Sequence, residues 1–194
     1  MQDSFSGGRE ACQGSNPWYA IWVRSRHEKI VSSSLAFKGY EPFVPLYRSS
    51  RRSSGPTPAQ MPLLPGYVFC RFDINRPLQV LTTPGVVSIV SAGVTPLPVM
   101  EEEISALKTV VASGHRVEPW PYLTEGQRVR IEGGPLRDLE GVLVKLKSDC
   151  KLIVSVTLLQ RSVGVEIARE FVVPLKDSAW RPAPLPERIA AQVS

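Results

Sequence analysis

Cysteine and histidine are scarce in this sequence of 194 residues, which contains three cysteines and two histidines. Cys12, Cys70 and Cys150 lie far apart and form no C-x-x-C pair, so the spacing predicts neither a disulfide framework nor a zinc site. His27 and His115 have no second ligand three or four residues away. No Ser-His-acid arrangement or glycine-rich phosphate loop is recognisable, and we therefore expect a protein that is not an enzyme and uses no cofactor or metal.

Long apolar runs are also missing. No run reaches the roughly 20 residues that a membrane-spanning helix requires, and residues 1–16 lack the apolar core of a signal peptide. The hydrophobic fraction of 43% and the charged fraction of 21% are ordinary for a globular protein. We therefore expect a cytoplasmic protein with no membrane partner.

The formal net charge of +5 is concentrated in the first third of the chain, where the first 60 residues hold eight basic and four acidic side chains. Residues 48–60, RSSRRSSGPTPAQ, form a long basic loop. Arg48, Arg51 and Arg52 are suited to neutralise the phosphates of a nucleic acid without reading its sequence. A solvated hairpin that serves only as a spacer is the alternative.

The stretch 63–72, LLPGYVFCRF, is typical of a turn that leads into a strand. Alternation places Tyr67, Phe69 and Arg71 on one face and the intervening apolar residues on the other. Both faces are apolar enough to be covered. The face with two aromatic rings is therefore either a docking surface for a partner or a surface that the chain covers itself.

Residues 18–90 follow the order strand, helix, strand, strand, helix, strand. The strands are expected at Trp18–Val23, 41–47, 63–72 and 86–90, and the helices at 25–37, after a capping box that starts at Ser25, and at 76–83. This order is that of a split βαβ fold, an antiparallel sheet with both helices on one face. On the open face we place Trp22, Tyr67, Phe69 and Arg71. A third helix is expected at 101–113, with an inner stripe of Ile104, Leu107 and Val111.

A second, all-β unit follows a proline-containing linker. Five short strands are expected at 128–131, 141–147, 152–156, 163–167 and 171–173, and they suggest a small closed barrel. The sequence thus predicts an α+β protein with a tail at 1–16, a first domain at 17–114, a linker at 115–123, a barrel at 124–176 and a second tail at 177–194.

Four motifs follow one another along the two predicted domains: Trp18-Tyr19, LLPGYVF at 63–69, TPGV at 83–86, and GQRVRI at 126–131 followed by GGPLRDLEGVL. The last resembles a KOW motif, and together the four resemble the NusG family of transcription elongation factors. The resemblance extends over both predicted domains, from about residue 18 to residue 176. It implies an NGN domain with a ferredoxin-like sheet, followed by an SH3-like KOW barrel.

The resemblance also implies a transcription elongation and antitermination factor that acts as a monomer on RNA polymerase. In the family, the first domain grips the clamp helices of the β′ subunit and its opposite edge touches the β subunit, which holds the clamp closed and suppresses pausing or termination. Carried over by position, the polymerase-binding residues are Trp22, Leu64, Pro65, Tyr67 and Phe69, and alternation adds Arg71 to this face.

Two further partners are implied. The KOW barrel of the family recruits the termination factor Rho or a small-subunit ribosomal protein, and the matching loop here is 158–163, with Leu159 and Arg161 as contacts. Arg48, Arg51 and Arg52 lie where family members reach toward upstream or non-template DNA. The basic loop, the terminal extensions and the missing Ser or Asp cap before the third helix are closer to RfaH-like and polysaccharide-locus antiterminators than to housekeeping members.

A single-stranded RNA-binding module of the RRM type is the alternative. Residues 66–72 fit much of the RNP1 consensus, in which aromatic side chains stack on bases. Pro65 stands where that consensus has a basic residue, and Val68 stands where it has Gly or Ala. The sequence does not decide whether the two predicted domains pack on each other.

Overall fold

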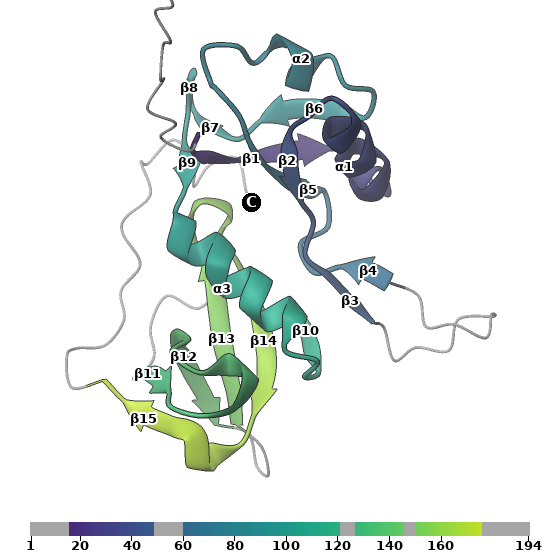
Figure 1. Ribbon diagram of the computed structural model, residues 1–194. Coiled ribbons are helices and arrows are strands. Elements are labelled where there is room, and N and C mark those ends of the chain that lie inside the picture. The colour runs from purple at the N-terminus through teal and green to yellow at the C-terminus, as the bar shows by residue number, and fades with distance from the viewer. Residues whose placement is uncertain (1–15, 49–59, 121–126, 146–149, 176–194) are drawn as a thin grey trace, which may run out of the picture.

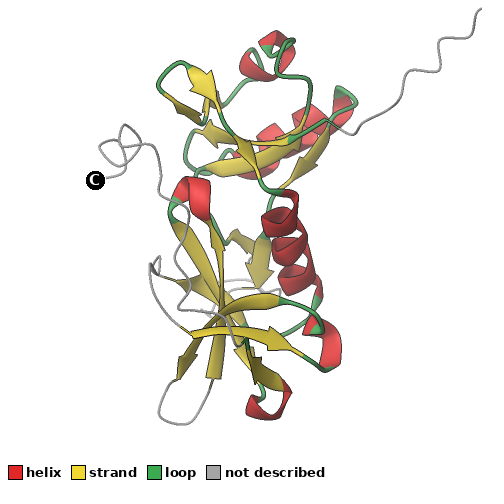
Figure 2. Ribbon diagram, turned by 90° about the vertical axis from the view of Figure 1, so that its left-hand side faces the viewer, coloured by secondary structure: helices red, strands yellow, loops and turns green. Residues whose placement is uncertain are grey.

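The computed structural model describes residues 16–48, 60–120, 127–145 and 150–175. Two antiparallel sheets lie one above the other, and the helix α3 (Glu101–Ala112) runs from the first sheet along the second (Figures 1 and 2). Within the described ranges, no helix is both long and apolar enough to cross a bilayer.

The first sheet has the predicted split βαβ arrangement. Its strand order is β2 (Glu41–Phe43), β5 (Tyr67–Arg71), β1 (Trp18–Val23) and β6 (Val86–Ile89), and β9 (Pro98–Val99) also pairs with β1. The helices α1 (Glu28–Phe37) and α2 (Leu78–Leu81) share one face of this sheet, as predicted. Val31, Leu35 and Val80 of these helices pack there against Val68 and Cys70.

The expected strand at 41–47 is divided into two. After β2 the chain passes Pro45, and β3 (Leu46–Arg48) then pairs with β4 (Gln60–Pro62) in a separate ladder. A proline cannot donate a ladder hydrogen bond, which accounts for the break. A second small hairpin joins β7 (Ser91–Ala92) to β8 (Thr95–Pro96).

The second sheet has six strands in the order β10 (Val117–Trp120), β14 (Arg161–Ile167), β13 (Cys150–Val156), β12 (Glu140–Lys145), β11 (Gln127–Ile131) and β15 (Val172–Pro174). Short 3-10 turns lie at η1 (Gly134–Leu136), η2 (Thr157–Leu159) and η3 (Arg169–Phe171). Five of the strands match the predicted ones. Among the described residues their pairing forms a path with two ends, β10 and β15, rather than a closed ring.

Strand β10 lies inside the segment 115–123 that the sequence indicated to be a linker. Four residues of this segment pair with β14, from Val117 opposite Val165 to Trp120 opposite Ser162. Pro119 is tolerated because β10 is an edge strand. Over these four residues the segment is therefore a strand of the second sheet. Pairing with β14 gives its backbone N–H and C=O groups hydrogen-bond partners, although the segment has no apolar alternation that would predict a strand.

A single apolar core joins the two sheets. It contains residues of the first sheet and its turn, of α3 and of the second sheet, among them Ala20, Leu63, Leu64, Phe69, Ile104, Leu107, Val110, Val129, Leu152, Val156, Leu158, Leu159 and Val165. The face of the first sheet that was expected to be open is thus largely covered by the chain itself. Burial of apolar side chains from both sheets favours this closed arrangement.

Candidate protein-binding surface

The turn at 63–66 positions the residues that the sequence analysis singled out. Gly66 has a φ of 84°, a conformation that glycine adopts without strain. The amide of Gly66 donates a hydrogen bond of 2.8 Å to Oε1 of Glu28, whose side chain is buried. Glu28 had been expected to complete a capping box with Ser25, but α1 has no side-chain cap. Its carboxylate holds the Leu63–Gly66 turn instead.

One end of the predicted face is exposed. The side chain of Trp22 is 52% exposed, Pro65 is exposed and Tyr67 is half-buried. Trp22 and Tyr67 are paired residues of β1 and β5, and the indole of Trp22 lies within 3.8 Å of the position of a Cβ on Gly66. These three apolar side chains therefore form a compact surface, which we call the Trp22 surface.

The other end of the face is buried. Leu64 is only 2% exposed and Phe69 is 0% exposed, and the Phe69 ring stacks on Phe43 with 6.2 Å between ring centroids. Alternation correctly placed Phe69 on the same face as Tyr67, but it did not show that this end is covered. In this arrangement the Phe69 ring has no access to a nucleic-acid base, which counts against the RRM-like alternative.

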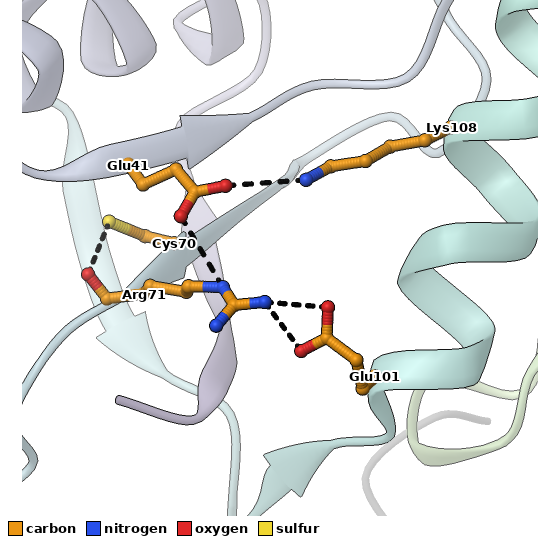
Figure 3. Close-up of polar contacts among 5 residues, drawn as sticks. All are labelled: Glu41, Cys70, Arg71, Glu101 and Lys108. Carbon is orange, nitrogen blue, oxygen red and sulfur yellow. Dashed lines mark hydrogen bonds and ion pairs between the residues drawn. The ribbon is translucent and has the colours of Figure 1, made fainter. Parts of the chain in front are cut away.

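Arg71 anchors α3 to the first sheet (Figure 3). Its Nη2 donates to both carboxylate oxygens of Glu101 at 2.6 Å, and its Nε lies 3.4 Å from Oε2 of Glu41. Lys108 of α3 reaches back to the same Glu41 carboxylate at 3.3 Å and lies over the Trp18 ring. Arg71 is therefore engaged in contacts within the chain.

Cys70, the neighbour of Arg71, points to the opposite face of β5 and is buried. Burial, with a smaller contribution from the charge of Glu41, raises the pKa of the Cys70 thiol to about 12. The thiol is thus uncharged at neutral pH and behaves as a small apolar side chain.

The loop of the second unit that is predicted to bind a partner overlaps η2, which packs against the first sheet and α3. Leu158 and Leu159 are buried in the shared core, whereas Arg161 is exposed at the start of β14. The amide of Thr157, the first residue of η2, donates to Oε1 of Glu103 on α3 at 3.0 Å. Burial raises the pKa of Glu103 above its ordinary value, while the hydrogen bond from Thr157 acts in the opposite direction.

Of the three arginines predicted to contact nucleic acid, the structure describes only Arg48. Arg48 is exposed at the end of β3, next to the loop. Arg51 and Arg52 lie outside the described residues.

No metal centre can be assembled in the described ranges, where His, Cys, Asp and Glu side chains form no group of three or more. Nδ1 of His27, one of the two histidines, forms a hydrogen bond of 3.0 Å with the carbonyl oxygen of Ser25.

Sequence reasoning missed the two carboxylates that organise this region. Glu28 and Glu103 each accept a hydrogen bond from a backbone amide far along the chain, on Gly66 and Thr157 respectively. Both lie in the first turn of a helix, where acidic side chains are common and need no distant partner to explain them. A buried acceptor for a distant amide leaves no local sequence signal, because the partner is fixed only by the tertiary fold.

Comparison with known proteins gives consistent matches. Residues 16–108 match the family model described as transcription termination factor NusG. The chain is 30% identical to the transcription termination/antitermination protein NusG of Thermus thermophilus in an alignment of 116 residues. This alignment covers 54% of this chain and 63% of that protein, somewhat less than two thirds of its length. It is 25% identical to the NusG protein of Borreliella burgdorferi over 79% of this chain and 95% of that protein.

A solved structure has the same fold. The structure titled "Domain interaction in Thermotoga maritima NusG" covers 80% of this chain and 95% of its own chain, with a TM-score of 0.50 and 23% sequence identity. The fold, the family model and the curated relatives agree with the motifs found in the sequence. This chain is thus similar in sequence and in fold to NusG transcription termination and antitermination proteins.

Proposed function

We propose that this protein binds RNA polymerase through the Trp22 surface and the adjoining residues of the first sheet, and that this contact suppresses pausing or termination. The observation that carries the proposal is the compact exposed surface formed by Trp22, Pro65 and Tyr67. Large aromatic side chains at the centre of an interface contribute much of the binding energy. The clamp helices of the β′ subunit are the partner that the family resemblance implies, with the β subunit at the opposite edge, and the site of action is the cytoplasm.

Leu64 and Phe69 belong to the proposed site but lie beneath this surface. They are buried in the core that also contains Leu158 and Leu159. Polymerase would contact the Trp22 surface first, and Leu64 and Phe69 after the second sheet moves away. Arg71 would become available only when its ion pairs with Glu41 and Glu101 break.

Binding of core RNA polymerase to the full chain tests the proposal. Replacing Trp22 and Tyr67 together by Ala should weaken binding by at least about 30-fold, the equivalent of about 2 kcal/mol for an interface aromatic. Phe37→Ala is the matched control, because Phe37 is 93% exposed on α1, away from the Trp22 surface. Equal affinities of the double variant and the control would contradict the proposal.

The second sheet is proposed to act as a KOW domain that recruits Rho or a small-subunit ribosomal protein through Leu159 and Arg161. The exposed Arg161 lies two residues after the buried Leu159, so a partner that engages both residues needs the second sheet to move away from the first. In pull-down experiments with each candidate partner, Arg161→Ala should retain less partner than the parent chain. The exposed control Arg137→Ala should retain as much as the parent. Equal retention by both variants would remove Arg161 from the site.

The basic loop is proposed to contact upstream or non-template DNA. Replacement of Arg48, Arg51 and Arg52 by Gln should reduce the salt dependence of binding to DNA-containing polymerase complexes by up to about three units of slope. Binding to the isolated clamp helices should not change. An unchanged salt slope would leave the loop as a spacer.

A further inference from the structure

The link between α3 and the second sheet is short because β10 is paired. Helix α3 ends at Ala112 and β10 begins at Val117, so four residues connect them. If β10 were free, the connection would run from Ala112 to Gln127, the first residue of β11, and would contain 14 residues. At about 3.5 Å per extended residue, the reach of the connection changes from about 14 Å to about 49 Å.

Strand β10 lies at one edge of the second sheet, where it pairs with β14 over four residues and makes side-chain contacts with β13 and β14. Glu118 forms an ion pair with Lys151, and the Lys151 ammonium lies 4.8 Å from the centre of the Trp120 ring. Trp120 packs over Gly164, where a Cβ would lie only 3.0 Å from the ring. Pro119 has no amide to donate to the ladder. Glu118, Trp120 and the core residue Val117 thus hold the strand to its neighbours.

The remaining five strands, β11 to β15, form a connected sheet without β10. They are also the five strands that the sequence predicted for an independent unit. Loss of β10 from the edge would therefore leave the pairing of the other strands unchanged.

We propose that β10 is a detachable strand that controls how far the second sheet can move from α3. While β10 is paired, the four-residue connection keeps η2 close to its contacts with α3 and the first sheet. Once β10 leaves β14, the connection is longer, and the effective concentration of the second sheet at its contacts with α3 and the first sheet falls. The −3/2 power of connection length gives a decrease of about six-fold. Insofar as the proposed function holds, β10 then regulates access to Leu64, Phe69, Leu158 and Leu159.

The test measures how often the closed arrangement opens and uses neither polymerase nor another partner, so its result is independent of the proposed function. The substitution Leu159→Cys, in a chain that also carries Cys12→Ser and Cys150→Ser, reports opening through the rate at which a thiol reagent modifies the new side chain. The variant Glu118→Ala with Trp120→Ala releases β10. The variant Glu132→Ala with Phe37→Ala is the control, because it removes one exposed glutamate and one exposed aromatic ring elsewhere.

The release variant should be modified about six-fold faster than the parent, and the control should match the parent. Pulsed electron paramagnetic resonance between labels on the exposed residues Ser33 and Glu170, in a chain without the Leu159→Cys substitution, should show added long distances only for the release variant. Amide exchange in β12 and β13 should be unchanged. Equal modification of the release variant and the parent would overturn the proposal, and so would faster exchange throughout β12 and β13, which would make β10 an integral part of the sheet.

Discussion

Replacing Phe69 by Ala should severely destabilise this protein, although its position on β5 suggests a surface residue of a docking face. The ring is fully buried, it stacks on Phe43, and it lies in the core that joins the two sheets. Removal of a buried phenylalanine ring costs about 3–5 kcal/mol, because the transfer free energy of the ring is lost and a cavity remains. Since small proteins have a total stability of about 5–15 kcal/mol, this is a large share.

Equilibrium unfolding of the full chain in urea, followed by tryptophan fluorescence and circular dichroism, measures this loss. Phe37→Ala, which removes a ring that is 93% exposed, should change the free energy of unfolding by no more than about 0.5 kcal/mol. Phe69→Leu retains most of the apolar volume and should fall between the two. A Phe69→Ala variant as stable as Phe37→Ala would refute the reasoning and would mean that this face is open in solution.

Four further predictions concern buried or closely packed positions. Glu28→Ala should lower the urea-unfolding free energy by about 1–3 kcal/mol, because the Gly66 amide loses its acceptor; no loss would contradict this. Burial raises the pKa of Glu103 in the folded chain. The stability that this shift contributes is fully present below pH 4.5, the ordinary pKa, and is lost as pH rises through the raised pKa. Glu103→Gln should therefore gain stability relative to the parent as pH rises from about 4 to about 7, whereas parallel unfolding curves would exclude this role. Gly141→Ala should lower the melting temperature, since its Cβ would lie 2.5 Å from the carbonyl oxygen of Ile153, and an unchanged melting temperature would show that the sheet adjusts. Cys70, with a pKa of about 12, should resist thiol reagents at about pH 8 until the chain unfolds, and rapid labelling of the native Cys12→Ser, Cys150→Ser chain would show that it is accessible.

The sequence by itself determined the resemblance to NusG proteins, the order of the elements in the first sheet and the side to which each β5 residue points. Alternation along β5 assigned Val68, Cys70 and Phe72 to one face, and these residues pack with Val31 and Leu35 of α1. This prediction succeeded because strand periodicity is local and depends only on backbone geometry. The five strands β11 to β15 were predicted for the same reason.

Only the tertiary structure decided what covers the other face. Periodicity shows that Phe69 lies on an apolar face. It does not show what covers that face, because a partner protein and a distant part of the same chain remove it from water equally well. The burial of Phe69 together with Leu159, the bond from Thr157 to Glu103 and the pairing of β10 with β14 all join residues far apart in the sequence. Such contacts depend on where the two sheets meet, and that position is set by the summed burial of many side chains rather than by any local pattern.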